Sequence, residues 1–219
     1  MTMITEPAPN FDSLARAYRL LEVIAFGRTL ERARFCMLDR LAGCRDILVL
    51  GEGDGRCLAR LVSAVPAARI HCVDASAAML DRAARRIAGT EAARRVTFVR
   101  ADAFAADFPP AGYDAVVTLF FLDCFRAEQV ALLVERVAAA VKPGGLWLFA
   151  DFAIPAAGLA RIRARLVLAV LYAFFRWRTG LPARELPPSE KILCKAGFFP
   201  VDERSFSGGF IRSALLERR

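Results

Sequence analysis

A short apolar run that ends in a glycine-rich loop constrains the fold of this chain most strongly. Residues 47–50 read Ile-Leu-Val-Leu, and Gly51-Glu52-Gly53-Asp54-Gly55 follows at once. Four consecutive apolar residues are typical of a strand buried on both faces of a parallel sheet. Glycines directly after such a strand let the backbone turn sharply and approach a ligand closely, because no Cβ intervenes. The segment predicts a strand, a tight loop and a helix that begins near Arg56.

Apolar runs and helical patterns alternate along the rest of the chain. Helices are predicted at 76–88, with Ser76 as the N-cap, and at 127–141, stopped by Pro143-Gly144-Gly145. Further strands are predicted at 69–73, 96–99, 113–119 and 146–150. Such alternation builds an α/β fold, a parallel sheet with helices on both faces. Residues 11–41 have a helical pattern that Gly27 divides, with a second apolar stripe formed by Leu30, Ala33, Met37 and Leu41.

The glycine loop and the next strand together indicate the kind of ligand. Asp74 follows Gly51 by 23 positions, at the end of the next predicted strand. A carboxylate at about that spacing accepts hydrogen bonds from ribose hydroxyls. The loop reads GxGxG, whereas a dinucleotide needs its third glycine one place later. The spacing therefore favours S-adenosylmethionine, which has no phosphate, over a nicotinamide cofactor; a plain tight turn is the alternative.

Five segments resemble the motifs of the class I S-adenosylmethionine-dependent methyltransferases, roughly from Asp46 to Asp151. They are VLGEGDGR, VDASAAML, VRADAFAADFP, YDAVVTLFFLDCF and VKPGGLWLFADF. The resemblance implies a Rossmann-like, doubly wound, mostly parallel seven-stranded sheet with an N-terminal helical cap. It also implies one methyltransferase domain over 1–219, with the cap at 1–45, the cofactor-binding core at 46–151, and a substrate-side helix and the final strands at 152–219.

The resemblance assigns cofactor contacts residue by residue. Asp74 would hold the ribose diol. Asp102 would accept a hydrogen bond from the adenine amino group, and the Ala103 N–H would lie near the adenine ring. Thr118, Leu119 and Phe120 would line the methionine side. The full predicted set of cofactor-binding residues is Gly51, Glu52, Gly53, Gly55, Asp74, Ala75, Met79, Asp102, Ala103, Thr118, Leu119, Phe120 and Tyr18.

One position departs from the family pattern. The acid that usually stands two places before the first glycine is Val49 here. Glu52, inside the loop, is the candidate substitute for it. The N-terminal FDSLARAYRLLEVIAFG also resembles the opening of the ubiquinone/menaquinone-pathway C-methyltransferases and their small-molecule relatives, with Phe11 and Arg19 as departures, and places Tyr18 over the cofactor.

The acceptor is expected beyond the carboxyl ends of the fourth and fifth strands, where ligands of open α/β sheets bind. Phe120, Phe121 and Phe125 follow the fourth strand, and Phe152 follows the fifth. Aromatic faces stabilise a sulfonium, although core packing is the simpler role for any one of them. Asp123 and Asp151 are the candidate catalytic carboxylates, because carboxyl groups are rarely placed among large apolar residues unless they have a specific role. Methyl transfer can also proceed by proximity alone, without a base.

The segment 159–177 is predicted to be a helix on the substrate side. Leu159, Ile162, Leu166, Val170, Ala173 and Trp177 share one face. The centre, 166–175, is apolar all round, which predicts burial on more than one side. A lid, a homodimer contact, a peripheral membrane contact and simple core are the alternatives. The loop TGLPARELP at 179–187 follows it.

Composition excludes several other classes of protein. The longest apolar run, 166–175, is about half of a membrane span, and the N-terminus lacks a signal-peptide pattern, so a cytoplasmic location is expected. Six scattered cysteines and a single histidine predict no metal site and reduced thiols. The net charge of +8 comes from dispersed arginines, such as Arg82, Arg85, Arg86, Arg94 and Arg95, which predict a solvated face.

Three functions remain open from the sequence. The leading one is methyl transfer to a small, apolar or aromatic acceptor, because the motif series ends in a phenylalanine-rich segment. A non-catalytic cofactor-binding or partner-binding module is favoured by Val49 and by the apolar helix. RNA methylation draws only on the net charge. The fourth strand lacks the Asn/Asp-Pro-Pro-aromatic sequence of base-amino methylation, so no specific nucleic-acid partner is expected.

Overall fold

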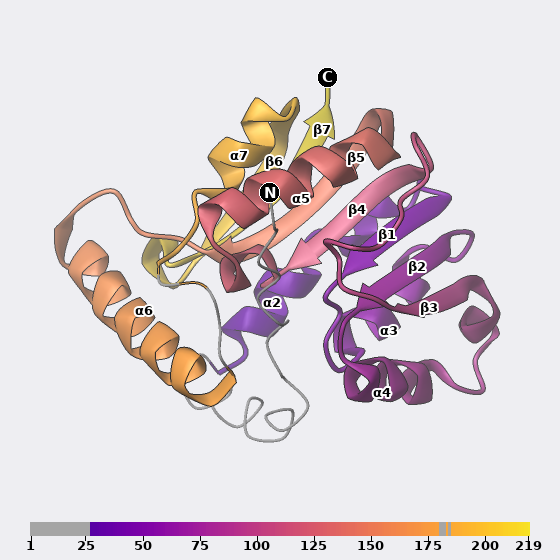
Figure 1. The fold of residues 1–219 in the computed structure, drawn as a ribbon, viewed down its shortest axis with the longest axis horizontal. Coiled ribbons are helices and arrows are strands. Elements are labelled where there is room, and N and C mark those ends of the chain that lie inside the picture. The colour runs from indigo at the N-terminus through magenta and orange to yellow at the C-terminus, as the bar shows by residue number, and fades with distance from the viewer. Residues whose placement is uncertain (1–26, 180–182, 184) are drawn as a thin grey trace, which may run out of the picture.

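Seven strands form one sheet in the computed structural model, which describes residues 27–179, 183 and 185–219 (Figure 1). The strand order is β3-β2-β1-β4-β5-β7-β6. The strands are β1 (Asp46–Leu50), β2 (Arg69–Asp74), β3 (Val96–Arg100), β4 (Tyr113–Leu119), β5 (Val141–Phe152), β6 (Phe198–Phe206) and β7 (Ile211–Arg218). The first five strands pair in parallel, and β7 runs antiparallel to both of its neighbours. The predicted Rossmann-like, mostly parallel seven-stranded sheet is confirmed.

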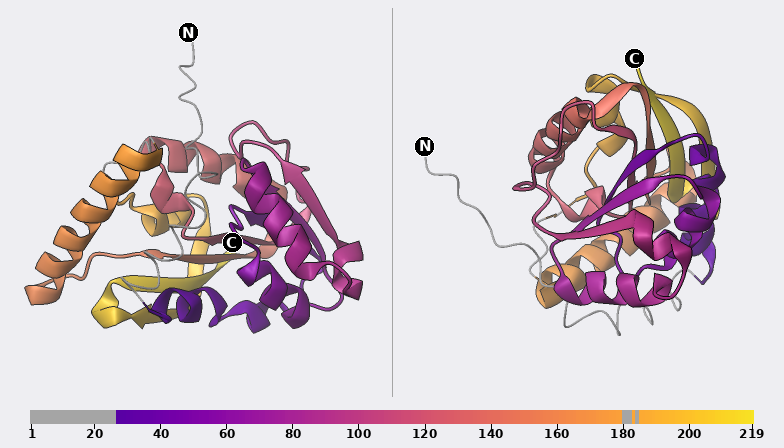
Figure 2. Two further views of the ribbon diagram at one scale, coloured as in Figure 1. Left: turned by 90° about the horizontal axis from the view of Figure 1, so that it is seen from below. Right: turned by 90° about the vertical axis from the view of Figure 1, so that its right-hand side faces the viewer.

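Helices cover both faces of this sheet (Figure 2). The helices are α2 (Thr29–Phe35), α3 (Arg56–Ala64), α4 (Ala77–Ile87), α5 (Ala127–Ala140), α6 (Gly158–Thr179) and α7 (Ser189–Lys195). Leu48 and Leu50 of β1 pack in one core with α5 and α7, whereas Ile47 and Val49 pack in a second core with α3 and α4. Successive strand residues point to opposite faces, so an unbroken apolar run fills both cores.

The second predicted apolar stripe is confirmed, but its helix is shorter than expected. Leu30, Ala33, Met37 and Leu41 are all buried. The α-helix nevertheless ends at Phe35, and the short helix η1 (Leu38–Leu41) continues the segment. Met37 has a φ of −134° and a ψ of 12°, a non-helical conformation that breaks the helical path between them. The preceding part of the predicted N-terminal cap lies outside the described residues.

The boundary between α5 and β5 also differs from the prediction. The helix ends at Ala140, and β5 begins at Val141, before the Pro-Gly-Gly sequence. Val141 pairs with Tyr113 and Leu146 pairs with Ala115, so residues 142–145 form an irregularity in the register. Gly144 there has a φ of +71°. The glycines mark a bulge within a strand, not the end of a helix.

One dispersed arginine was wrongly predicted to be solvated. Arg95 ends the short helix η2 (Glu91–Arg95) and donates hydrogen bonds to the carbonyl oxygens of Val62, Val65 and Ala68. These carbonyls belong to the C-terminal end of α3 and the turn after it, where acceptors lack helical partners. Arg95 therefore closes that helix end, a role that only the folded chain shows.

The prediction for α6 was wrong in one respect. Its centre was expected to be buried on more than one side, yet Leu166 and Val170 are exposed. Among the α6 residues whose side chains the structure describes, Ala164, Leu168 and Tyr172 are buried, and they lie on a single face. No helix formed by the described residues has the length and apolar character needed to cross a bilayer. A periodic pattern shows which residues share a face, but not whether anything covers that face.

Candidate functional site

The glycine loop between β1 and α3 adopts a backbone that only glycine takes easily. Gly51, Gly53 and Gly55 have φ values of +68°, +71° and +84°. A Cβ on Gly51 would lie 2.1 Å from Cδ2 of Phe121, and one on Gly55 would lie 2.4 Å from the Cα of Ala83. A Cβ on Gly53 would meet nothing within 4 Å. Two glycines therefore permit close packing of the protein itself, and the middle one faces open space that a ligand can occupy.

Asp74 stands beside this loop, as the sequence predicted. The residue ends β2, and its Oδ2 accepts a hydrogen bond from the Gly53 N–H at 3.4 Å. Its Oδ1 accepts from the Ser76 N–H at 2.9 Å. Ser76 is the N-cap of α4, as predicted, and its Oγ accepts from the N–H of Met79. The loop, the acid and the start of α4 thus form one hydrogen-bonded edge of the sheet.

Asp102 and Ala103 follow β3 at the same edge. Asp102 is exposed, and its Oδ1 accepts a hydrogen bond from the Phe104 N–H at 3.0 Å. Ala103, the next residue, is buried. This turn fixes the carboxylate while leaving its other oxygen available to a ligand. Ala75, the remaining predicted contact near Asp74, is also exposed, whereas the predicted Tyr18 lies outside the described residues.

Glu52 has a structural partner inside the loop. Its Oε1 accepts a hydrogen bond from the Leu58 N–H of α3 at 2.7 Å. Burial raises the pKa of Glu52 to about 8, and the Leu58 N–H and the charge of Arg34 oppose that rise. Val49, where the family usually has an acid, is buried in the core against α3. The carboxyl group that ties the loop to the following helix comes from the loop instead of the strand.

The end of β4 gives a mixed result for the predicted contacts. Thr118 is fully buried, and its Oγ1 accepts a hydrogen bond from Nε1 of Trp147, so its side chain does not line a ligand surface. Leu119 and Phe120 are partly exposed. Phe120 has a φ of +55°, a strained conformation for an aromatic residue, and its N–H donates to the Ala150 carbonyl at 2.7 Å. Such strain is concentrated at functional sites.

Arg34 is a site residue that sequence reasoning missed. It comes from α2, and its guanidinium carbon lies 4.9 Å from the centroid of the Phe120 ring. Its charge lowers the pKa values of both Glu52 and Asp123, against the larger effect of burial. One of the two arginines of a short helix carries no signal in the sequence. Only the fold brings it between the glycine loop and the end of β4.

Asp123 and Asp151 face each other at the ends of β4 and β5. Both are buried, and the Asp123 N–H donates to Oδ2 of Asp151 at 3.1 Å. Burial raises the pKa of both carboxyl groups, and the charge of Asp123 raises that of Asp151 further. Two carboxyl groups in contact cannot both ionise readily, so the pair retains a proton between them. The sequence predicted both residues but not their contact.

Aromatic rings come from the same two strand ends as this carboxyl pair. Phe120 stacks edge-on against Phe152 with ring centroids 5.4 Å apart, and Phe121 does the same against Phe125 at 5.1 Å. The hydroxyl of Tyr172 in α6 donates to the backbone carbonyl of Asp123 at 3.3 Å. The arrangement provides a proton-holding pair within an apolar shell, next to the glycine loop through the contact of Phe121 with Gly51.

These groups fit S-adenosylmethionine. The space beside Gly53 admits a ligand to the loop backbone, and the carboxylates of Asp74 and Asp102 stand at the ends of adjacent strands. A ribose and an adenine amino group both present hydrogen-bond donors to such acceptors. The ends of β4 and β5, where the rings gather, would then receive the methionine side. A phosphate-bearing ligand fits less well at the ends of β2 and β3, because a carboxylate stands at each of them.

Comparison with known proteins agrees with this reading. Residues 47–145 match a family model described as a methyltransferase domain. An uncharacterized methyltransferase of Mycobacterium tuberculosis is 33% identical over 121 residues, covering 54% of this chain and 57% of that protein. The demethylmenaquinone methyltransferase of Thermus thermophilus is 32% identical over 158 residues, covering 71% of this chain and 67% of that protein. The chain therefore spans a little over half the length of its mycobacterial relative.

A solved structure shows the same fold. The O-methyltransferase family 2 protein of Planctomyces limnophilus, in complex with apigenin, superposes with a TM-score of 0.70 at 21% identity. The match covers 95% of this chain and 62% of that one.

One family accounts for all of these observations. They are the glycine loop, the two carboxylates at the ends of β2 and β3, the strand order of the sheet and the 32% identity to the Thermus enzyme. The chain belongs to the class I S-adenosylmethionine-dependent methyltransferases.

Proposed function

We propose that this protein transfers a methyl group from S-adenosylmethionine to a small acceptor of apolar or aromatic character. The observation that carries the proposal is the Asp123–Asp151 pair inside its shell of phenylalanines. Such a shell favours an apolar molecule, and the pair offers it one polar point of attachment. The Thermus relative is named for demethylmenaquinone and the Planctomyces structure contains apigenin, which supports a small-molecule acceptor.

On the cofactor side, each residue has a distinct role in the proposal. The loop at Gly51, Gly53 and Gly55 allows close approach. Asp74 accepts from the ribose hydroxyls, and Asp102 accepts from the adenine amino group. The remaining contacts of the proposal are the backbone or side chains of Glu52, Ala75, Met79, Ala103, Leu119 and Phe120. When bound, the cofactor supplies an electrophilic methyl group on a sulfonium.

On the acceptor side, the role of the carboxyl pair is to take up a proton from the acceptor. Most of the acceleration of an in-line displacement comes from holding the two reactants aligned, which the rings provide. Ionised Asp123 accepts a proton from the acceptor atom, and Asp151 holds the pair's other proton. Because burial raises the pKa of both groups, the pair takes up that proton at a higher pH than an exposed carboxyl group would.

Isothermal titration with S-adenosylhomocysteine tests the cofactor site. The Asp74→Asn variant should bind about 10-fold to 100-fold more weakly than the wild type, the range for loss of a charge-assisted hydrogen bond. Asp81→Asn, on the exposed face of α4, is the matched control and should bind normally. An unchanged affinity in Asp74→Asn would remove that residue from the ribose role.

Turnover tests the acceptor side. Incubation of the protein with methyl-labelled cofactor and a cell extract, followed by mass spectrometry of small molecules, should reveal a labelled apolar product. Asp123→Asn should lower that turnover while leaving the affinity for S-adenosylhomocysteine intact. Cofactor binding without any labelled product would contradict the proposal and favour a non-catalytic binding module.

A further inference from the structure

The outer face of α6 is the largest set of exposed apolar side chains on one element of the described chain. Leu159, Ile162, Leu166 and Val170 are 80%, 57%, 63% and 69% exposed. In a helix that turns about 100° per residue, these four share one side, opposite the buried Ala164, Leu168 and Tyr172. Isolated exposed leucines are common, but a continuous stripe of this kind marks an interaction surface.

Arginines border this stripe on both sides. Arg163 lies at one edge, and Arg165 and Arg176 lie at the other, by the same helical repeat. All three are exposed, and among the described residues none of them forms an ion pair. The α6 sequence contains no aspartate or glutamate. The face is therefore apolar along its middle and positively charged at its edges.

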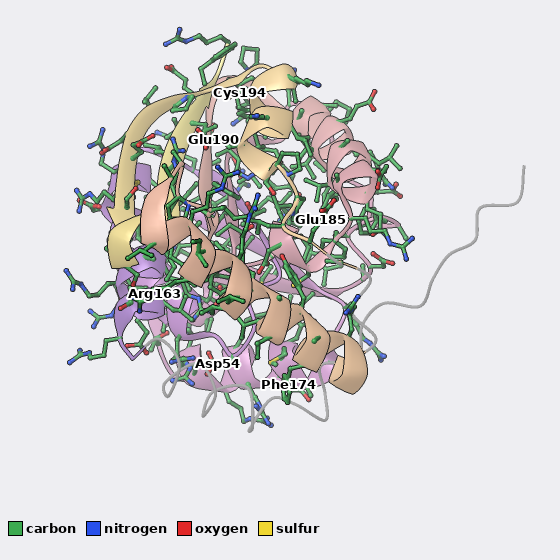
Figure 3. All side chains as sticks on the ribbon, turned by 90° about the vertical axis from the view of Figure 1, so that its left-hand side faces the viewer. Asp54, Arg163, Phe174, Glu185, Glu190 and Cys194 are labelled. Carbon is green, nitrogen blue, oxygen red and sulfur yellow. The ribbon has the colours of Figure 1, made fainter. Side chains whose placement is uncertain are left out.

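The position of α6 leaves this face accessible from one side of the molecule. Figure 3 views the protein from the side that α6 covers, and the helix crosses in front of the other helices and strands, with Arg163 labelled beside it. Figure 1 shows the same helix at the periphery, away from β1, β2 and β3. A flat surface that approached from this side would meet the stripe and its arginines together.

We propose that α6 docks on the surface of a bilayer that contains anionic lipids, with its apolar stripe in the interface and its arginines at the headgroups. An apolar stripe with arginine flanks and no acids is the pattern of a helix that lies in a membrane interface. Long arginine side chains keep their charge among headgroups while their methylene groups extend the apolar face. A second copy of this chain offers no such match, because its α6 would bring arginines against arginines.

The docking also bears on how an acceptor reaches the site, a point that rests on the proposed function. Tyr172, on the buried face of α6, donates its hydroxyl hydrogen bond to the backbone of Asp123. One helix thus has the proposed membrane surface on one side and the acceptor-side loop on the other. An apolar acceptor dissolved in the bilayer would have a short path to the rings around Asp123 and Asp151.

Vesicle flotation tests the docking without any acceptor. The wild-type protein should float with vesicles of equimolar phosphatidylcholine and phosphatidylglycerol, and only weakly with phosphatidylcholine alone. The Leu166→Gln/Val170→Gln variant should lose about 10-fold or more in affinity, because the apolar contacts are removed. The Arg163→Gln/Arg165→Gln variant should lose roughly 5-fold in affinity for the vesicles for each arginine replaced. Leu132→Gln on α5, where Leu132 is 58% exposed, is the matched control and should float like the wild type.

The outcomes separate this proposal from the proposed function. Loss of flotation in the α6 variants alone, with circular dichroism and S-adenosylhomocysteine binding unchanged, supports the docking. No flotation of the wild type, equal flotation with both lipid compositions, or an equal loss in Leu132→Gln overturns it. A dimer by light scattering that α6 variants dissociate, without flotation, also overturns it and identifies a self-association face. Flotation in a protein that binds no S-adenosylhomocysteine overturns only the proposed function.

Discussion

The two halves of the site are built in different ways. At the ends of β2 and β3, carboxylates accept hydrogen bonds from backbone N–H groups two residues further along the chain. Asp74 accepts one from the Ser76 N–H, and Asp102 accepts one from the Phe104 N–H. At the ends of β4 and β5, Asp123 and Asp151 come from different elements and face each other in an apolar shell. The cofactor half is therefore built mainly of local turns, which the hydrogen bond from the Gly53 N–H to Asp74 and the packing of Gly55 on Ala83 join together. The acceptor half exists only when distant segments pack, and its polar groups depend on each other.

The largest effect is expected from Gly55→Ala, in the cofactor half. The new Cβ would meet the backbone of Ala83, and the φ of +84° would be strained. Strain of about 1–2 kcal/mol and overpacking of about 1–3 kcal/mol together predict a loss of roughly 3 kcal/mol in the free energy of unfolding, measured in urea. Gly89→Ala, with a φ of +77° and open space, is the control and should lose only the strain. Equal losses in both would mean that α4 does not pack on the loop this closely.

The second prediction concerns the acceptor half and its pH dependence. The folded-state pKa of Asp151 is raised by burial and by the charge of Asp123. The stability that this carboxyl contributes is therefore present at low pH and lost as the pH rises through its folded pKa. Relative to the wild type, Asp151→Asn should gain stability as the pH rises above the range in which an exposed carboxyl group ionises, by at most about 1.4 kcal/mol per pH unit, because an asparagine is never charged.

Denaturant unfolding at several pH values measures this gain. Asp107→Asn, at an exposed position, is the control and should follow the wild type at every pH. A constant difference between Asp151→Asn and the wild type across the pH range would show that folding does not raise the pKa of Asp151. The comparison between the halves would then lose its basis.

The smallest effect is expected from Ser76→Ala, again in the cofactor half. Its Oγ caps α4 by accepting from the Met79 N–H at 3.2 Å. Loss of an N-cap costs about 1 kcal/mol, without any pH dependence, because the hydroxyl does not titrate. Ser63→Ala is the control, since that exposed hydroxyl only donates to the Ala59 carbonyl within α3. A pH-dependent loss in Ser76→Ala would contradict the view that the N-cap of α4 acts locally in this half.

The elements that the sequence predicted correctly are those with a local physical cause. The four apolar residues of β1 need burial on both faces, Ser76 supplies the acceptor that a helix start requires, and the loop glycines permit positive φ values. The burial of the Thr118 side chain was not predicted, because a threonine at a strand end gives no local sign of which way it turns. In the structure it bonds to Trp147, which is 29 residues away.

The amino-acid sequence alone determined the α/β class, the cofactor loop and the two acids after β2 and β3, because short-range spacing and backbone conformation specify them. Only the tertiary structure placed Arg34 over Phe120, joined Asp123 to Asp151 and left the stripe of α6 exposed. These features depend on contacts between segments far apart in the chain. A periodic pattern defines a face, but what covers that face is decided by packing.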